Sequence, residues 1–316
     1  MPATTATAPG KCILFGEHAV VYNRPAIAVP INQVSVRATI VPLPGGSRED
    51  IWIEAPAIHL SSRLDQLSDS HPIKITLLAI QDVLKCSNLP PLRLIIKSTI
   101  PPASGMGSSA AVAVAICRSL PNFLGHPLDP PTINQIAYLS ERRQHGNPSG
   151  IDNTVITYQQ PIYFIKGHPW QLVHVKQPFT LIIADTGEPS PTGKVVSDVR
   201  RRWEDSPDKF ETLFTQVAQI TDQARTAIEH GKIEYLGSLL SQNHILLQEM
   251  TVSSTKLDLL VSTSLQSGAL GAKLSGGGRG GNMIALVAPE KVDNVADALK
   301  QAGASQTIIF TIPITS

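Results

Sequence analysis

The sequence has few cysteines, no long apolar run and no signal-peptide pattern. Its 316 residues include only three cysteines, Cys12, Cys86 and Cys117, which are widely spaced. An odd number of separated cysteines fits no metal-ligand spacing and no disulfide framework, so we expect reduced thiols in a cytoplasmic protein. No apolar run approaches the roughly 18 residues that span a membrane. The N-terminal residues also lack the basic start and apolar core of a signal peptide.

Net charge is nearly absent as well. Lysine and arginine together number 26 and aspartate and glutamate 25, which leaves a formal charge of +1. The chain therefore has no global field that would attract nucleic acid or an acidic membrane surface, and we expect neither as a partner. Hydrophobic residues make up 42% of the chain, enough for a sizeable core. The length is that of one large domain or of two.

The pattern of apolar residues predicts a mixture of strands and helices without regular βαβ alternation, which is typical of an α+β fold. A boundary near residues 176–179 divides the chain into 1–178 and 179–316. Strands are expected over residues 12–15, 26–41, 51–54, 92–97, 163–166, 178–184, 282–287 and 307–312. Helices are expected over residues 71–84, 108–120, 132–144, 208–229, 234–249, 254–267 and 290–302.

The most informative segment is PPASGMGSSAA, residues 101–111. Gly105 and Gly107 let the backbone approach a ligand closely, and a helix that starts near Ser108 directs free N–H groups at the loop. Such a loop is suited to phosphate. It is not a Walker A motif, because the chain has no G-x-x-x-x-G-K-[ST]. The alternative is an ordinary strand-to-helix connection in which the serines cap the helix.

Two further segments carry charged residues beside turns. In APGKCILFGEHAVVY, residues 8–22, Lys11 lies at a strand entrance, and Glu17 and His18 separate two apolar runs. In LSERRQHGNPSGIDN, residues 139–153, a turn separates Glu141 from Asp152, so the two carboxylates can converge on Mg²⁺ and on an attacking hydroxyl. Taken alone, the first segment is also compatible with a surface turn and the second with a solvated helix end.

The fourth segment is AKLSGGGRGGNMIA, residues 272–285. Its run Gly276–Gly281 contains five glycines in six positions, interrupted by Arg279, and cannot form a stable regular element. Such a run makes either a flexible hairpin or a backbone that wraps around a ligand. The phosphate-type loop earlier in the chain favours the ligand.

In this order the four segments resemble those of the GHMP kinases, from residue 8 to about residue 285. Within that superfamily the chain is most similar to mevalonate kinases, on GKCILFGEHAVVY, on HGNPSGIDN, on residues 243–276 and on PSPT at residues 189–192. The resemblance implies an α+β, two-domain GHMP kinase fold with the active site in the interdomain cleft. It also implies ATP-dependent phosphorylation of the 5-hydroxyl of mevalonate, with Mg²⁺ as cofactor and a homodimer as a possible assembly.

The resemblance also assigns roles to individual residues. Lys11 and Asp152 would be catalytic, the lysine polarising the acceptor hydroxyl and the aspartate orienting or deprotonating it. Ser109 and Glu141 would hold Mg²⁺. The residues that would bind ATP are Pro101, Gly105, Met106, Gly107, Ser108, Ser109, Gly277 and Gly278. Those that would bind the acceptor are Glu17, His18, Thr192 and Gly276.

The last glycine loop departs from the family pattern. Many mevalonate kinases carry GAGGGG there, whereas this chain has Arg279 within the run. The arginine either contacts a phosphate or carboxylate or points to solvent. The sequence therefore leaves alternatives to a mevalonate kinase: a phosphomevalonate kinase, another mevalonate-pathway GHMP kinase or a decarboxylase. A catalytically inactive metabolite sensor is a further one, although Lys11, Glu141 and Asp152 are all present.

Overall fold

A computed structural model describes residues 2–47, 50–86, 88–101, 104–145 and 148–315. The chain forms two compact units, each assembled from several segments. The first unit comprises Met1–Lys11, Val34–Pro102 and Gly107–Gln159, and the second comprises Cys12–Gln33, Ala103–Met106 and Gln160–Ser316. The units are defined by contacts within each of them rather than by chain order, so the boundary at residue 178 stays a prediction.

The first unit is built on a mixed sheet with strand order β4-β3-β5-β2. Its pairs are antiparallel except for β3 and β5, which run parallel. Strand β1 also pairs with β2. The strands are β1 (Thr4–Phe15), β2 (Ala26–Pro42), β3 (Ile51–Ala55), β4 (Leu60–Arg63) and β5 (Leu92–Ser98), of which β1 and β2 continue into the second unit.

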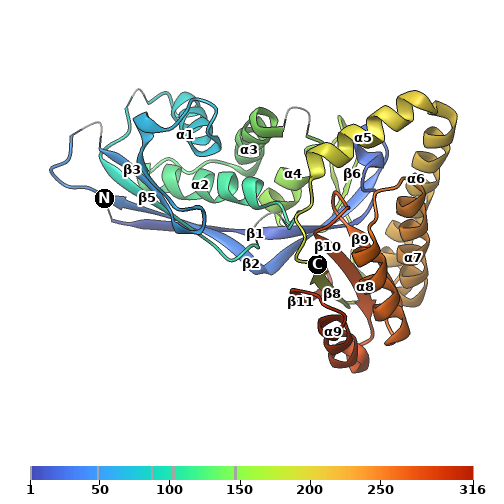
Figure 1. Cartoon of the computed structure of the whole chain (residues 1–316). Helices are drawn as coiled ribbons and strands as arrows, with labels where there is room; N and C mark the ends of the chain where they lie inside the picture. Colours follow the sequence, from blue (N-terminus) through green and yellow to red (C-terminus); the bar gives the residue numbers. More distant parts are fainter. Residues whose placement is uncertain (1, 48–49, 87, 102–103, 146–147, 316) are drawn as a thin grey trace. The chain divides into compact units, whose positions relative to one another are not determined.

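Four helices pack against one another on one face of this sheet (Figure 1). They are α1 (Pro72–Val83), α2 (Ser108–Leu124), α3 (Pro130–His145) and α4 (Ile151–Tyr158). Helix α2 lies at their centre and contacts each of the other three. Its small side chains, among them Ala110, Ala111 and Ala115, are fully buried and allow close approach. This packing holds the start of α2 beside α3 and α4.

The second unit contains an antiparallel sheet in the order β11-β8-β10-β9. Helices α7 and α8 contact β9, and α9 contacts β8 and β11. Near the start of β2, β6 (Ile162–Phe164) joins β2 to β7 (Gln171–Leu172). The other strands are β8 (Phe179–Asp185), β9 (Gly271–Ser275), β10 (Asn282–Val287) and β11 (Gln306–Ile312). The helices are α5 (Thr192–Asp205), α6 (Pro207–Glu229), α7 (Ile233–Glu249), α8 (Thr255–Gln266) and α9 (Val292–Gln301). Short 3₁₀ turns occur at Ala19–Tyr22, Pro56–Ile58, Leu64–Gln66 and Pro289–Lys291.

Helix α7 and strand β9 meet backbone to backbone. A Cβ atom on Gly271 would lie 1.8 Å from the carbonyl oxygen of Gly237, and one on Gly237 would lie 2.4 Å from that of Leu270. Real Cβ atoms do not approach other atoms so closely, so both positions require glycine. The contact places the side chains later in α7 directly over β9.

The predicted α+β class is confirmed, and the predicted strands and helices match observed elements within a few residues, except at two ends. The first strand begins eight residues earlier than expected, at Thr4 rather than Cys12, and α2 runs four residues past the expected end. Helices α4 and α5 and strands β4, β7 and β9 were not expected. Among the described residues, no helix is both long and apolar enough to cross a membrane.

Candidate active site

Lys11 and Asp152 form an ion pair in the first unit, with Lys11 Nζ 2.9 Å from Asp152 Oδ1. Lys11 is the last residue that β1 contributes to this unit and is buried, with 4% of its side chain exposed. Asp152 lies in the first turn of α4 and is 31% exposed. A carboxylate that is held by a buried ammonium group and still reaches solvent is suited to accept a proton from a bound hydroxyl.

Ser109 and Glu141 form a second pair in the same unit. Ser109 Oγ, in the first turn of α2, donates a hydrogen bond of 2.5 Å to Glu141 Oε1 on α3. Glu141 is buried, at 5% exposure. The packing of α2 on α3 therefore brings a hydroxyl and a carboxylate together at a helix start, where the N–H groups favour anions.

Gly107 connects the two pairs. It precedes α2 with a left-handed backbone, at φ 73°, which favours glycine. A Cβ atom here would lie 2.8 Å from Ile156 Cδ1 and 3.0 Å from Lys11 Cγ. The missing side chain lets the stem of Lys11 pack against the start of α2. A substituent at Gly107 would displace Lys11 from Asp152.

The Ser109–Glu141 pair fits a part of a magnesium site. Mg²⁺ prefers oxygen ligands and commonly takes one or two carboxylates, with waters and substrate phosphates completing the octahedron. No group of three His, Cys, Asp or Glu side chains suited to a metal occurs within the described ranges. The pair is thus compatible with a metal that arrives with its nucleotide, rather than with an all-protein cage.

In the second unit the glycine run packs closely against the start of α5 and against Val252. A Cβ atom on Gly277 would lie 2.6 Å from Thr192 Oγ1, and one on Gly278, where φ is 80°, would lie 2.0 Å from the carbonyl oxygen of Val252. Ser190 Oγ donates to the carbonyl oxygen of Gly278 at 2.9 Å. These contacts place the predicted acceptor residue Thr192 against Gly277.

The part of the phosphate-type loop that belongs to this unit, Ser104–Met106, is held by residues near the glycine run. Asn282 Nδ2 donates to the carbonyl oxygen of Ser104 at 2.6 Å. A Cβ atom on Gly276 would lie 4.0 Å from the carbonyl oxygen of Gly105. Met106 is buried. Ser104 and Gly105 of the first predicted loop therefore lie beside the second glycine loop within this unit, while Pro102 and Ala103 lie outside the described residues.

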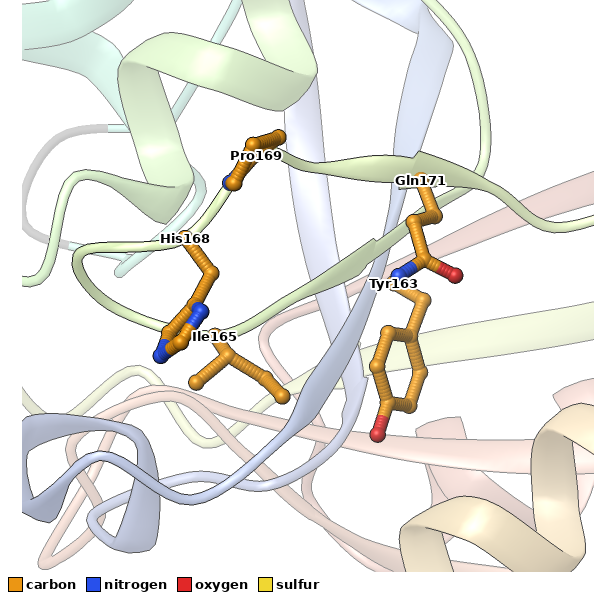
Figure 2. Close-up of a pocket in the computed structure, with 5 residues that line it drawn as sticks. All are labelled: Tyr163, Ile165, His168, Pro169 and Gln171. Carbon is orange, nitrogen blue, oxygen red and sulfur yellow. The ribbon is translucent and has the colours of Figure 1, made fainter.

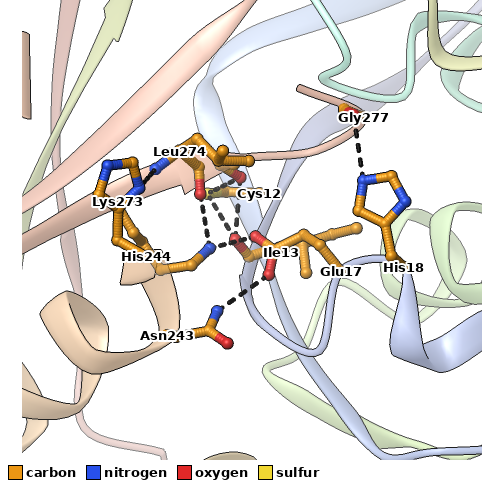
Figure 3. A network of polar contacts seen from close by, with 10 residues as sticks. Cys12, Ile13, Glu17, His18, Asn243, His244, Lys273, Leu274 and Gly277 are labelled. Carbon is orange, nitrogen blue, oxygen red and sulfur yellow. Dashed lines mark hydrogen bonds and ion pairs between the residues drawn. The ribbon is translucent and has the colours of Figure 1, made fainter. Parts of the chain in front are cut away.

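Glu17 and His18 are both buried and face different partners (Figure 3). Glu17 contacts Lys273 and Asn243. His18 Nε2 lies 3.1 Å from the carbonyl oxygen of Gly277. A carbonyl can only accept, so Nε2 carries the hydrogen and Nδ1 remains an acceptor. Burial lowers the pKa of His18 from its usual 6.5 to about 4, so the ring is neutral at pH 7.

The lowered pKa of His18 predicts a pH dependence of stability. Between pH 6.5 and about 4 the unfolded chain binds a proton at His18 and the folded chain does not, so stability is lost as pH falls through this window. A replacement of His18 by Gln removes this contribution. We expect the loss of unfolding free energy between pH 7 and pH 4.5 to be about 2 kcal/mol smaller in the variant. Urea unfolding at both pH values measures it, and equal losses in both proteins would contradict it.

Arg279 forms contacts with a side chain and a backbone carbonyl of the second unit. Its Nη1 lies 2.5 Å from Asp198 Oδ2 on α5, and its Nε donates to the carbonyl oxygen of Thr251 at 3.2 Å. The hydrogen bond from Arg279 keeps the pKa of the Asp198 carboxyl below its usual range. Arg279 is thus paired with a carboxylate of its own unit, whereas a contact with a ligand stays a prediction.

A small open pocket of about 200 Å³ lies in the second unit and contains none of the predicted site residues (Figure 2). Two of its polar wall groups have partners: Tyr163 Oη donates to Asp222 at 2.7 Å, and Gln171 Oε1 accepts from Arg225 at 2.8 Å. The Arg225 guanidinium also stacks over the Tyr163 ring. The pocket is lined by Tyr163, Ile165, His168, Pro169 and Gln171.

The structure thus brings together Lys11 with Asp152, Ser109 with Glu141, and His18 and Thr192 with the glycine run. Pro101 follows strand β5 and is half-buried, and Ser108 is the first residue of α2. The sequence interpretation missed Lys273, Asn243 and Asn282, all fixed by hydrogen bonds around the predicted residues. The one signal that could have indicated Lys273 is a lysine between two apolar residues, three positions before a glycine run.

Comparisons with known proteins agree with this arrangement. The family model of the GHMP kinases N terminal domain matches residues 73–160, and that of the GHMP kinases C terminal matches residues 224–305. The mevalonate kinase of Thermococcus sibiricus is 34% identical over 94% of this chain and 93% of its own. The crystal structure of L. major mevalonate kinase in complex with R-mevalonate is 32% identical, with a TM-score of 0.83, over 99% of this chain and 96% of that one.

A more distant structure shares the fold alone. The phosphomevalonate kinase of Streptococcus pneumoniae has a TM-score of 0.83 but only 18% identity, over 97% of this chain and 99% of that one. The two family models and the nearly full-length similarity to mevalonate kinases decide the classification. The chain belongs to the GHMP kinase family.

Proposed function

We propose that the protein transfers the γ-phosphoryl group of ATP to the 5-hydroxyl of mevalonate, giving 5-phosphomevalonate and ADP in isoprenoid precursor synthesis. The observation that carries the proposal is the similarity to mevalonate kinases over more than nine-tenths of the chain. The ion pair of Lys11 with Asp152 supports it, because it supplies both a cation and a proton acceptor for an alcohol.

In the proposed reaction the 5-hydroxyl oxygen forms a bond to the γ-phosphorus, the bond from that phosphorus to the bridging oxygen breaks, and ADP leaves. Asp152 orients the hydroxyl and takes its proton. Lys11 holds the carboxylate at 2.9 Å and neutralises negative charge that develops on the attacking oxygen. Because the transition state is loose, positioning and charge neutralisation supply most of the catalysis, and a small set of residues suffices.

The nucleotide would be held by the backbone of the two glycine loops. Gly105, Gly107, Ser108, Gly277 and Gly278 would supply backbone N–H groups, and the start of α2 would add its partial positive charge. Mg²⁺ neutralises charge on the β- and γ-phosphates when it is bound. Ser109 and Glu141 are the residues that would hold it. Glu17 and His18 would line the acceptor site, and Thr192 and Gly276 would complete it.

A phosphorylated acceptor is the second candidate, and the position of Arg279 weighs against it. Recognition of a second phosphate would call for an additional unpaired cation. Arg279 is paired with Asp198. We therefore expect Arg279→Ala to lower kcat/KM with mevalonate by less than ~10-fold, because the main charges of the reaction come from other segments. Steady-state kinetics measures this, and a larger loss confined to 5-phosphomevalonate would favour that acceptor instead.

The proposal is tested by an assay of ADP release with Mg²⁺ and ATP, comparing mevalonate, 5-phosphomevalonate, homoserine and galactose. We expect turnover with mevalonate and formation of the 5-phosphate. Turnover with 5-phosphomevalonate alone would retain the family and reassign the acceptor. No turnover with mevalonate would refute the proposed substrate.

A further inference from the structure

The second unit contains a fully buried ion pair that the proposed reaction does not use directly. Lys273 Nζ contacts Glu17 Oε1 and also donates to the carbonyl oxygen of Leu274 at 2.6 Å. Asn243 Nδ2, on α7, lies 3.4 Å from the other carboxylate oxygen of Glu17. Lys273 and Asn243 are 0% exposed and Glu17 is 1% exposed. Figure 3 shows both side chains converging on Glu17.

Stability alone is a weak reason for such a pair. Removal of two charges from water is costly, and well-packed apolar residues in place of a buried ion pair are often equally stable or more so. A buried, hydrogen-bonded pair does fix one geometry, since each charge requires its partner at a set place. The pair is therefore better explained by the two segments that it holds in place.

The Glu17 end of the pair lies in a turn with unusual backbone. Gly16 has φ 95°, and a Cβ atom there would lie 2.4 Å from the carbonyl oxygen of Pro25. His18 follows with φ 62°, a left-handed conformation uncommon for a residue with a side chain. Such conformations persist only when surrounding contacts hold them. We call residues 16–18 the motif turn.

The Lys273 end leads into the glycine run. Lys273 lies in β9, three residues before Gly276. The motif turn makes two cross-links to this segment: Glu17 contacts Lys273, and His18 bonds the carbonyl oxygen of Gly277. One turn is thereby attached to β9 and to the loop that follows it. Leu274 N also donates to His244 Nδ1 at 3.3 Å, which links β9 to α7.

We infer that Lys273 is a positioning residue for phosphoryl transfer. Acting through Glu17, it holds the motif turn and the run Gly276–Gly278 in one arrangement, so that His18 and the backbone N–H groups of the run keep their places for the acceptor and the phosphates. Glu17 then serves the site through its fixed position. The inference rests on the proposed function for its kinetic consequence, whereas its structural consequence can be measured without any substrate.

The test compares the double variant Lys273→Met/Glu17→Gln with wild type. The double variant leaves neither charge buried without a partner, so it folds where Lys273→Met alone could fail. Val295→Ala, a truncation of a buried side chain in α9, is the matched control for lost core packing. The melting temperature, kcat, the KM values for mevalonate and ATP, and amide hydrogen exchange are measured for all three proteins.

We expect kcat/KM of the double variant with mevalonate to fall by about tenfold or more, chiefly through kcat, because small displacements of positioning groups are costly. Amide exchange should accelerate in the motif turn and at Gly276–Gly278. The control should stay within about twofold of wild type in kcat/KM, with slow exchange at both places. Unchanged exchange at both places in a folded double variant overturns the inference. Absence of wild-type turnover with mevalonate refutes the proposed function instead, and exchange still decides the role of Lys273.

Discussion

Replacement of Asp152 by Asn should lower kcat at least ~100-fold, the usual loss for a positioned acid–base group. Asparagine keeps the size of the side chain and a carbonyl oxygen for Lys11, but it cannot take the hydroxyl proton. Binding of ATP should change little, because the predicted nucleotide contacts are backbone groups of the glycine loops. Steady-state kinetics gives kcat, and equilibrium binding of an ATP analogue gives the nucleotide affinity.

Asp222→Asn is the matched control for this prediction. It is the same chemical change at a carboxylate that accepts a hydrogen bond from the Tyr163 hydroxyl, and we expect it to leave kcat within about twofold of wild type. Because Lys11 is buried, the Asp152 variant must first be shown to be folded by circular dichroism. A folded Asp152→Asn protein that keeps half of its activity would contradict the assigned role.

Replacement of Glu141 by Gln should raise the Mg²⁺ concentration needed for half-maximal activity by roughly tenfold or more, as is typical when a ligand or its support is lost. The amide oxygen can still accept the hydrogen bond of Ser109, so α2 and α3 should stay packed. Only the negative charge is removed. A magnesium titration at saturating ATP and mevalonate measures the effect.

A glutamate outside the site provides the comparison for Glu141. Glu211 accepts hydrogen bonds from Arg24 and Trp203, and Glu211→Gln should leave the magnesium titration unchanged. An unchanged titration in the Glu141→Gln protein as well would mean that the metal ligand is another residue. Loss of activity at every magnesium concentration, with folding intact, would likewise argue against a simple ligand role.

Most of the fold could be predicted because most of its elements have ordinary apolar patterns. Helix α5 was missed because it is polar almost throughout and buries only Val195 and Val199. Strand β9 was missed because Lys273 occupies a fully buried position, where periodicity predicts an apolar residue. Helix α4 was missed because it is short and because the sequence before it is rich in Gly, Asn and Pro. In each case tertiary contacts override the local signal.

Residues of the candidate site could be proposed from the sequence because their residue types are unusual rather than because of apolar periodicity. Glycines beside serines, and carboxylates beside turns, are chemically conspicuous, and their order along the chain identified the family. The hydrogen-bond partners of these residues could not be predicted from the sequence. Asn282 directly follows the glycine run, but nothing in the sequence indicates its partner or that of Asn243. Their contacts with the Ser104 carbonyl and with Glu17 connect residues more than 170 positions apart. Only the folded chain reveals such pairs.

The close seating of α7 on β9 has a consequence for how this part of the protein can change. Gly237 and Gly271 touch through their backbones. Asn243 lies six residues along α7, about 9 Å from Gly237, and Lys273 lies two residues along β9, about 7 Å from Gly271. Any side chain at either glycine would lift the helix and move Asn243 away from the pair. Exchange of α7 between homologous enzymes should therefore succeed only when β9 is transferred with it, and recombination within residues 237–273 should be tolerated poorly.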